Sequence, residues 1–330
     1  MITRADYTDF PPLMVEFLNY MDAIKNKSKN TISEYALDLR TFFRFMKVNR
    51  GLASPDPKEF KKIKIKDIDE DFIKSITLTD AYAFLSFCKD VMNNSARTRA
   101  RKVSTIRAFF KFCTTQKHIL KENPMQDLDT PKLKQTLPKY LTLDESVELL
   151  KNAAEGPNAE RDLAIVTLFL NCGMRLSELV SLNYTDIRDD NTVKITGKGN
   201  KERTIYLNET CISAINNYMR VRPVDGVPAK DKNALFLSSR KQRISPKTVQ
   251  HIVYTALEKA GLSGYSVHKL RHTAATLMYQ YGGVDVLVLK EILGHENVGT
   301  TQIYTHVVNE QLKKATDSNP LNNMEKAKKD

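Results

Sequence analysis

The segment from residue 124 to residue 141 constrains the fold most, because it contains Pro124, Pro131 and Pro138 and few aromatic residues. Proline has no backbone N–H to donate and tends to end helices, so a stretch of this composition commonly separates folded units. A chain of 330 residues also fits two domains better than one. We therefore expect a first domain at 1–125, a linker at 126–141, a second domain at 142–316 and a polar tail at 317–330.

The first domain is expected to be helical. Thr31 and Glu34 have the spacing of a capping box, and the apolar residues after them recur every three or four positions. A second amphipathic pattern, over residues 96–113, predicts another helix. Its apolar side carries Val103, Ile106, Phe110 and Cys113, and its other side carries Arg97, Arg101, Arg107 and Lys111. The basic side is a candidate phosphate-binding face, with an ordinary solvated face as the alternative.

The second domain has a mixed pattern. Thr142 and Glu145 form another capping-box pair, which predicts the start of a helix. The β-branched runs 192–196 and 203–207 flank a turn-rich segment and predict a hairpin. The later pattern is helical again, and in residues 267–281 the apolar positions, Tyr281 included, predict a core face. The expected fold class is therefore mostly α with a small β-sheet, the sheet belonging to an α+β second domain.

Charge and hydropathy limit the classes of function. Lys and Arg number 51 against 39 Asp and Glu, a net charge of +12, which favours a polyanionic partner but does not separate nucleic acid from an anionic membrane surface. No stretch approaches the roughly 18 consecutive apolar residues of a membrane helix, and the N-terminal residues lack the apolar region of a secretory signal. We therefore expect a cytoplasmic protein that does not enter the membrane. The four cysteines are widely spaced beside apolar segments, which favours buried thiols over disulfides or a zinc site.

Four segments of the second domain concentrate polar residues that a plain core would not need. They are GMRLSEL at 173–179, TGKGNKER at 196–203, HKLRHT at 268–273 and LGHENVGTTQIYTH at 293–306. No carboxylate cluster of the metal-ligating type accompanies them, so we expect no metal cofactor. Together the segments hold a candidate for each requirement of metal-free phosphodiester cleavage: charge neutralisation, a nucleophile and a proton donor.

The basic candidates are two arginines and a lysine. The planar guanidiniums of Arg175 and Arg271 match phosphate oxygens and stay charged, which suits them to stabilise the transition state. Lys198, in the predicted hairpin turn, is placed to donate a proton to a leaving 5′-hydroxyl. Glu178 follows Arg175 by three residues and either orients a catalytic side chain or forms an ordinary helix salt bridge. Taken alone, each is equally explained as a surface or salt-bridged side chain.

The remaining candidates are two histidines and a tyrosine. Histidine exchanges protons near neutral pH, so His268 is a candidate for assisting proton transfer at the nucleophile, and His295 for donating a hydrogen bond to the phosphate. Tyr304 is the candidate nucleophile. A structural histidine or a half-buried tyrosine is the alternative reading of each.

In order and wording, the four segments resemble the tyrosine recombinases, the phage-integrase and Xer family. GMRLSEL is similar to the first arginine box of that family, HKLRHT to its His-x-x-Arg box, LGHENVGTTQIYTH to its closing box, and GKGNKER to the segment that bears its lysine. In the first domain, NTISEYALDLRTFFRFM and ARKVSTIRAFFKF resemble the family's SAM-like core-binding domain. The resemblance implies that six residues take the family's active-site roles: Arg175, Lys198, His268, Arg271, His295 and Tyr304.

The same resemblance implies a two-domain clamp around duplex DNA and the activity of a site-specific recombinase. Tyr304 would attack a phosphate to leave a 3′-phosphotyrosine and a free 5′-hydroxyl, and two rounds of exchange would pass through a Holliday junction. Because the phosphotyrosine bond retains the energy, no metal, ATP or other cofactor is implied. The implied partners are double-stranded DNA with an inverted-repeat site and further copies of the chain in a homo-tetramer. A DNA translocase or an accessory DNA-bending protein is a further candidate partner.

Residues that contact DNA outside the active site are predicted from basic side chains near helix patterns. Phosphate contacts supply most of the affinity of such proteins, and a few base contacts select the site. The candidates are Arg97 and Arg101 from the pattern at 96–113, and Arg240, Lys241 and Arg243 just before the capped pattern at 245–257.

Two other classes of function remain as alternatives at this stage. A non-catalytic DNA-binding factor would keep the basic lobes but not need Tyr304, and a topoisomerase-like or hairpin-forming strand transferase would use the same chemistry without synapsis. Among recombinases, chromosome-dimer resolution competes with integration or excision of a mobile element. The stretch 50–76 is longer than its equivalent in the bacterial Xer pair, which leaves this biological role open.

Overall fold

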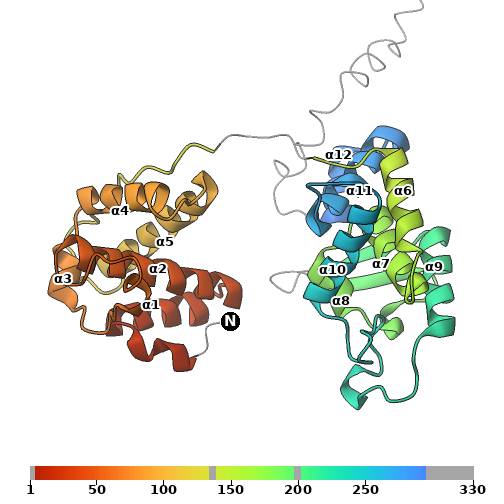
Figure 1. The fold of residues 1–330 in the computed structure, drawn as a ribbon, viewed down its shortest axis with the longest axis horizontal. Coiled ribbons are helices and arrows are strands. Elements are labelled where there is room, and N and C mark those ends of the chain that lie inside the picture. Colours follow the sequence, from red (N-terminus) through yellow and green to blue (C-terminus); the bar gives the residue numbers. More distant parts are fainter. Residues whose placement is uncertain (1–3, 134–138, 197–201, 295–330) are drawn as a thin grey trace, which may run out of the picture. The chain divides into compact units, whose positions relative to one another are not determined.

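The structure is a computed structural model that describes residues 4–133, 139–196 and 202–294. Within these residues the chain is mostly helical and has one two-stranded sheet, which confirms the expected fold class (Figure 1). It divides into two compact units, Met1–Gln135 and Thr136–Asp330. Each unit is described below by itself.

The first unit is a bundle of helices. Its elements are η1 Arg4–Asp9, α1 Pro12–Ala23, α2 Lys29–Asn49, η2 Phe60–Lys62, α3 Glu70–Lys74, α4 Leu78–Asp90 and α5 Ala96–Thr115. The prediction of a helix over 96–113 is confirmed by α5. The predicted cap of α2 is wrong: the helix begins at Lys29, and its N-cap is Ser28, whose hydroxyl accepts a hydrogen bond from the Thr31 backbone N–H at 3.3 Å. Thr31 therefore lies inside the first turn and does not precede it.

The core of the first unit is rich in phenylalanine and borders a buried ion pair, that of Asp38 and Lys102. Rings from α1, α2, α4 and α5 meet edge to face, for example Phe17 with Phe109 at 5.4 Å and Phe42 with Phe84 at 5.1 Å between centroids. Beside this core the buried carboxylate of Asp38, on α2, accepts hydrogen bonds from three side chains of α5. The donors are Arg101 at 2.5 Å, Lys102 at 3.0 Å and Thr105 at 2.9 Å. The network joins α2 to α5.

The second unit contains more helices and the sheet. Its elements are α6 Leu143–Ala153, α7 Ala159–Cys172, α8 Leu176–Ser181, η3 Tyr184–Asp186, β1 Thr192–Thr196, β2 Glu202–Tyr206, α9 Glu209–Val221, η5 Ala229–Asp231, α10 Pro246–Lys259, α11 Val267–Gly282 and α12 Val286–Leu293. The predicted capping box is confirmed: the Thr142 hydroxyl accepts from the Glu145 backbone N–H, and the Glu145 carboxylate accepts from the Thr142 backbone N–H.

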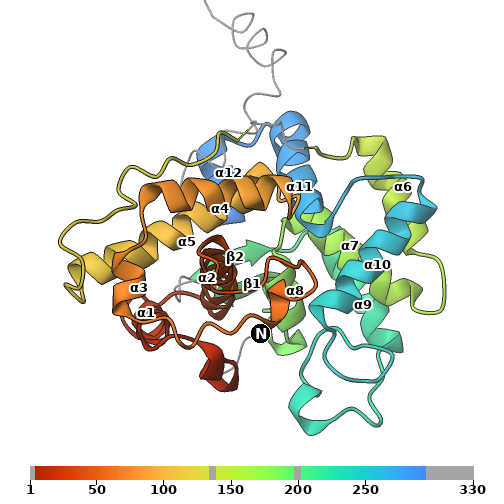
Figure 2. The same cartoon turned by 60° about the vertical axis from the view of Figure 1, so that its left-hand side comes forward.

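Helix α7 is the central helix of the second unit. It contacts α6, α9, α10 and α11 and lies among them in Figures 1 and 2. A run of its residues from Ala164 to Leu170 is buried, as expected of a helix with neighbours on every side. On α11, Val267, Leu270 and Ala274 are buried as predicted, but the prediction for Tyr281, in the last turn of the helix, is wrong, because its side chain is 69% exposed.

The predicted hairpin is confirmed as β1 and β2, which pair antiparallel with Thr192 opposite Tyr206 and Ile195 opposite Arg203. All four cysteines are buried free thiols, also as predicted. Burial raises the pKa of the Cys88 thiol to about 11 and that of Cys113 to about 12, so both stay protonated near neutral pH. Among the described helices, none combines the length and apolar character needed to cross a membrane.

Candidate active site

Four of the predicted site residues belong to the described part of the second unit. Arg175 directly precedes α8, Glu178 lies in its first turn, and His268 and Arg271 lie in the first turns of α11. Lys198, His295 and Tyr304 lie outside the described residues. The geometry therefore concerns the two arginines, the carboxylate and the end of α12 that precedes His295.

A left-handed glycine brings the two arginines together. Gly173 ends α7 with φ +58, a conformation that favours glycine, and a Cβ added to it would lie 2.9 Å from Cδ2 of Leu293. The chain turns at this residue and reaches Arg175 two positions later. The Gly173 carbonyl accepts a hydrogen bond from Nη1 of Arg271 at 2.7 Å. The turn after α7 thus both presents Arg175 and anchors Arg271.

Glu178 holds Arg175 at two points. Its Oε2 accepts from the Arg175 backbone N–H at 2.7 Å, and its Oε1 accepts from Nη1 of Arg175 at 2.7 Å. The Glu178 side chain is only 5% exposed, whereas that of Arg175 is 34% exposed. Of the two readings of Glu178 left open by the sequence, the structure therefore shows an i,i+3 salt bridge that also fixes the direction of a partly exposed guanidinium.

Arg271 is buried, and His268 is exposed one turn before it on α11. The two Nη atoms of Arg271 donate to the carbonyl oxygens of Gly173 and Leu293. The next residue, His272, is half-buried. Its pKa is lowered by burial, and then by the neighbouring charges of Arg271, His268 and Lys269. Positive charge therefore accumulates along this face of α11.

A third arginine, which the sequence did not single out, completes the cluster. Arg203 on β2 donates from Nη2 to Oε2 of Glu178 at 2.9 Å and from Nη1 to the carbonyl of Leu293 at 2.8 Å. Burial lowers the pKa of Arg203; Glu178 opposes this and Arg175 adds to it. One available signal was its position two residues before Ile205, since alternate strand residues share a face and Ile205 is buried.

The three guanidiniums converge on the carboxyl end of α12. Arg203 and Arg271 both donate to the Leu293 carbonyl, and Arg175 donates from Nη2 to the Gly294 carbonyl at 2.6 Å. The last carbonyls of a helix lack partners within the helix and carry partial negative charge. The three cations thus share one carboxylate, that of Glu178, and three helix-end carbonyls, those of Gly173, Leu293 and Gly294. This positive excess, with Arg175 partly exposed, fits a bound oxyanion such as a phosphate.

The predicted DNA-contacting residues have different surroundings. Arg97 is exposed on α5, while Arg101 is occupied by Asp38 and, at 2.7 Å, by Glu34. Arg243 is half-buried and donates to the carbonyls of Val180 and Leu182 and to Oδ1 of Asn183. It therefore ties its own segment to the end of α8.

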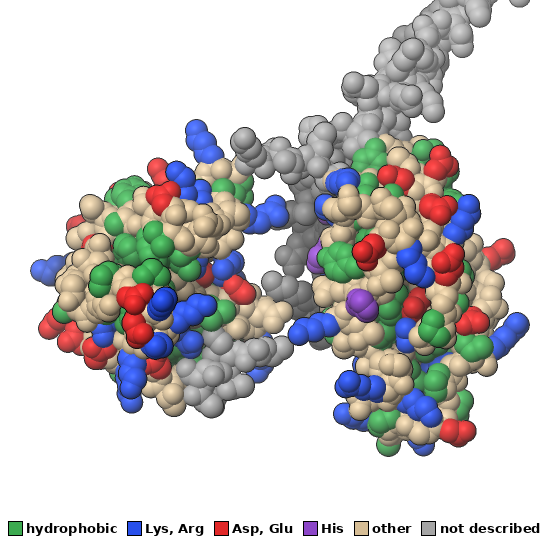
Figure 3. Space-filling view, viewed as in Figure 1, with side chains coloured by type: hydrophobic (Ala, Val, Ile, Leu, Met, Phe, Trp, Pro, Cys, Tyr) green, Lys and Arg blue, Asp and Glu red, His purple; other side chains and the backbone are tan. Residues whose placement is uncertain are grey.

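The connection between α9 and α10 carries a basic surface. In Figure 3, Lys and Arg side chains gather at the lower end of the second unit, where this connection lies. Its exposed basic residues include Lys230, Lys232, Arg240 and Lys241. Two of the predicted DNA-contacting residues, Arg240 and Lys241, thus belong to a larger basic surface.

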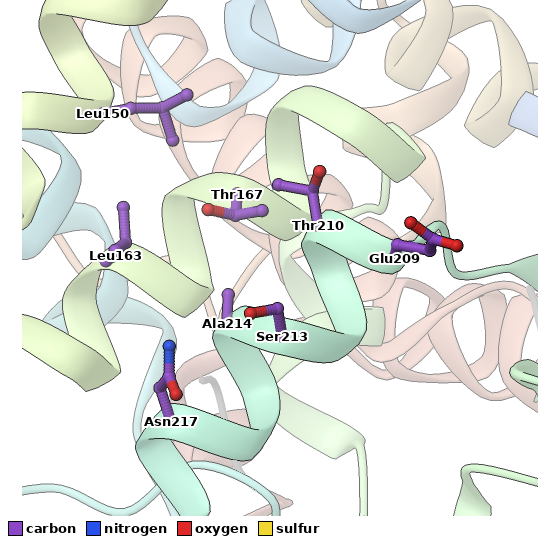
Figure 4. A pocket seen from close by; sticks show the side chains of 8 residues that line it. All are labelled: Leu150, Leu163, Thr167, Glu209, Thr210, Ser213, Ala214 and Asn217. Atoms are coloured by element: carbon purple, nitrogen blue, oxygen red, sulfur yellow. The ribbon is translucent and has the colours of Figure 1, made fainter.

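Two other features of the described residues bear on the chemistry of the second unit. Within the described ranges no group of three or more His, Cys, Asp or Glu side chains is placed to hold a metal ion. A depression of about 440 Å³ lies between α6, α7 and α9, as Figure 4 shows. Its lining includes Thr167, Ser213 and Glu209 but none of the predicted site residues. The depression is therefore separate from the arginine cluster.

Comparison with known proteins identifies the family. The sequence model described as "Phage integrase family" matches residues 139–311, and the model "Phage integrase, N-terminal SAM-like domain" matches residues 14–117. The chain is 54% identical over 314 residues to Tyrosine recombinase XerC of Caldanaerobacter subterraneus subsp. tengcongensis, covering 94% of this chain and 88% of the relative. It is 34% identical to Tyrosine recombinase XerC of Thermodesulfovibrio yellowstonii, covering 93% and 96%.

Solved structures share the fold. The crystal structure of XerH site-specific recombinase bound to palindromic difH substrate, a post-cleavage complex, matches with a TM-score of 0.66 and 20% identity over 93% of this chain and 94% of that one. The Tn1549 transposon integrase in complex with a circular intermediate DNA matches with a TM-score of 0.67 and 17% identity over 88% and 94%. The family models and the XerC relatives together show that the chain belongs to the phage integrase family and is a tyrosine-type site-specific DNA recombinase.

Proposed function

We propose that this recombinase cleaves DNA at a phosphate held by Arg175 and Arg271, with Tyr304 as the nucleophile. One observation carries the proposal: the two arginines, 96 positions apart in the sequence, direct their guanidiniums to adjacent carbonyls, those of Leu293 and Gly294. His295 follows directly, and Tyr304 is ten positions beyond Gly294. The proposed phosphate-binding groups therefore lie at the start of the segment that carries the proposed nucleophile.

The proposed reaction exchanges one phosphoester for another. The Tyr304 oxygen forms a bond to phosphorus, the bond from phosphorus to the 5′-oxygen breaks, and the 3′-phosphate stays on the tyrosine. His268 assists removal of the phenol proton, and Lys198 donates a proton to the leaving 5′-oxygen. His295 donates a hydrogen bond to the phosphate. Because attack by a 5′-hydroxyl reverses the step, the reaction needs no ATP.

The arginines contribute electrostatic stabilisation. Charge builds on the non-bridging oxygens as the nucleophile attacks, and fixed guanidiniums stabilise it without reorganising. Arg271 is fixed by two carbonyls, and Arg175 by Glu178 and one carbonyl. Arg175 is partly exposed, and its guanidinium has five N–H donors, so donors of Arg175 remain for phosphate oxygens after these contacts are made.

The proposed substrate is double-stranded DNA with an inverted-repeat recombination site, bound by a homo-tetramer. The XerC relatives and the XerH complex with its palindromic substrate support this choice. They also favour Xer-type chromosome-dimer resolution over integration or excision of a mobile element. A cytoplasmic location follows from this role. Exchange of two sites by the purified chain alone would contradict a requirement for a DNA translocase or an accessory DNA-bending protein.

We assign the parts of the chain accordingly: 1–125 grips DNA, 126–141 is the linker, 142–316 catalyses and 317–330 is a tail. The two compact units and the two family matches support this division. Arg97, Arg240 and Lys241, which are exposed, are the proposed phosphate contacts outside the active site. Arg101 and Arg243 are expected to contribute less, because their guanidiniums already bind protein acceptors.

Capture of covalent adducts tests the nucleophile and finds the target site together. The protein is incubated with fragmented host DNA and denatured, and the DNA attached to it is sequenced. Three proteins are compared: wild type, Tyr304→Phe, and Tyr281→Phe as a matched control at an exposed tyrosine of α11. Wild type and Tyr281→Phe should give adducts at one inverted-repeat sequence, and Tyr304→Phe should give none. The free end should be a 5′-hydroxyl that a kinase can label.

Adducts that persist in Tyr304→Phe would overturn the assignment of the nucleophile. Adducts joined through a 5′-phosphate would overturn the proposed polarity of cleavage. The captured sequence then supplies the duplex for all later measurements.

A further inference from the structure

We infer that Arg203 is a positioning residue for DNA cleavage: it fixes Arg175 through Glu178 and fixes the end of α12 through Leu293. The inference rests on the proposed function, because it assigns Arg203 a part in the reaction attributed to this site. Arg203 itself need not touch DNA. Its guanidinium joins two acceptors that belong to different elements, α8 and α12.

The first contact completes the hydrogen bonds that hold the Glu178 carboxylate. Oε1 accepts from Nη1 of Arg175, and Oε2 accepts from the Arg175 backbone N–H and from Nη2 of Arg203. Three donors therefore fix the position of this buried carboxylate. Two of these three donors belong to Arg175, in the same turn as Glu178, and the third is Arg203. Without Arg203, the carboxylate of Glu178 would be freer to move together with Arg175. A shift of this kind misplaces the guanidinium on the phosphate, and small misplacements lower rates strongly.

The second contact fixes the end of α12. Arg203 shares the Leu293 carbonyl with Arg271, so the two arginines hold one atom between them. At the next residue, Gly294, φ is +61, and a Cβ added there would collide with the guanidinium of Arg203. The chain thus passes closely over Arg203 immediately before His295. Arg203 therefore sets the point from which the segment bearing His295 starts.

A purely structural role explains Arg203 poorly. Its side chain is only 12% exposed, and its Nε is buried with no hydrogen-bond partner in the structure. Burial of an arginine with an unpaired N–H costs stability, and an apolar side chain opposite Ile195 would avoid that cost. Arginine suits this position because its planar guanidinium has donors at a fixed separation, which join Glu178 to Leu293.

Arg222 provides a matched control in the same unit. It is another buried arginine, 8% exposed, and its guanidinium also donates to backbone carbonyls, those of Lys232 and Ala234. Arg222 also donates to the carbonyls of Pro223 and Leu235, and all four acceptors lie outside the arginine cluster. Arg222→Gln should therefore reproduce the structural cost of removing a buried guanidinium without touching the site.

The test measures single-turnover adduct formation on a nicked duplex that carries the captured site, at saturating DNA and below every melting temperature. Dissociation constants for DNA and melting temperatures are measured alongside. Arg203→Gln should slow adduct formation about 10- to 100-fold, with the DNA dissociation constant within about threefold of wild type. Arg203→Lys, which can reach only one of the two acceptors, should give an intermediate rate. Arg222→Gln should lower the melting temperature and leave the rate unchanged.

A double-mutant cycle separates positioning from independent effects. If Arg203 acts partly through Glu178 and partly through Leu293, Arg203→Gln should slow Glu178→Gln by a clearly smaller factor than it slows wild type. Rates that multiply, or a rate of Arg203→Gln equal to that of wild type or explained by lost DNA binding, would overturn the inference. If wild type forms no adduct, the proposed function fails and this inference falls with it. If wild type reacts and Arg203→Gln reacts equally fast, only the inference fails.

Discussion

Each of the two units buries a carboxylate among cations. The cluster in the first unit stabilises the fold, whereas the cluster in the second unit is arranged to bind a ligand. In the first unit, Asp38 accepts from Arg101, Lys102 and Thr105, which all lie on one helix, α5. These donors end on the same carboxylate. The cluster is complete in itself and joins two helices.

In the second unit three cations surround one carboxylate. Glu178 binds Arg175 from its own turn and Arg203 from a strand, and Arg271 reaches the same place from α11 through Leu293. Four of the contacts end on helix-end carbonyls, which are weaker partners than a carboxylate. A buried carboxylate is thus no sign of function by itself. Cations that come from several elements and end on backbone oxygens indicate a place for an anion.

Removal of Arg271 should give the largest effect and tests whether the second cluster serves catalysis. In Arg271→Gln, adduct formation on the nicked duplex should fall on the order of 10²–10³-fold, because a donor to the developing charge is lost. The change in melting temperature should be too small to explain that loss. Arg220→Gln, at an exposed arginine of α9, is the control. If the rate falls only in proportion to the unfolded fraction, Arg271 resembles the Asp38 cluster and the comparison fails.

Removal of Asp38 should give the reverse pattern, a loss of stability with little loss of rate. Asp38→Asn leaves the buried ammonium of Lys102 without its counter-ion, and breaking such a pair costs about 3 kcal/mol or more. Hydrogen exchange should accelerate in α2 and α5, and adduct formation at saturating DNA should stay close to wild type while the variant is folded. Asp90→Asn, on the exposed end of α4, is the control.

The paired replacement Asp38→Leu/Lys102→Met sharpens this result. Apolar residues of similar size can substitute for a buried ion pair with little loss of stability. Recovery of slow exchange in the paired variant would show that the buried charge is dispensable to the stability of the first unit. A strong loss of cleavage in folded Asp38→Asn would instead give the first cluster a role in the reaction.

The smallest expected effect concerns His272, which lies next to Arg271 on α11. Burial and then the charges of Arg271, His268 and Lys269 lower its pKa. Near pH 7.5 both the folded and unfolded states hold the neutral form. As pH falls through about 6.5, the unfolded state takes up the proton first, so wild type loses stability relative to His272→Gln until the folded state is also protonated.

Calorimetric melting temperatures of both proteins at pH 7.5 and 5.5 measure this difference, with His251→Gln, at an exposed position of α10, as the control. A wild type that gains stability relative to His272→Gln on acidification would contradict the sign. That outcome would place a negative partner near His272 and weaken the contrast between the clusters.

Local patterns in the sequence predicted much of the fold. The helix at 96–113, the hairpin and the capping box of Thr142 and Glu145 each depend on neighbours a few residues apart, and each is confirmed. The error at the start of α2 is equally local. Ser28 and Thr31 both suit an N-cap, and the pattern of apolar residues does not choose between them.

The sequence motifs predicted residues of the site, but they did not predict the hydrogen bonds that connect these residues. Arg175 and Arg271 were identified, but the carbonyls that they bind at the end of α12 lie 119 residues from Arg175 and 22 from Arg271. Arg203 contacts Leu293 across 90 positions, and Arg243 is tied to the end of α8 from about 60 positions away. Such contacts depend on how the whole unit folds. The roles of Lys198, His295 and Tyr304 stay predictions.

At the end of α12, the arginines that are proposed to bind phosphate also determine where the helix ends. A helix that continued past Gly294 would need the Leu293 and Gly294 carbonyls for its own N–H groups four residues on, but three guanidiniums already bind them. The arginines therefore act as the stop signal of the helix. A descendant that lost its chemistry and its arginines would be free to lengthen α12. A longer α12 would thus indicate that a related protein has lost the activity, even where its sequence motifs are no longer recognisable.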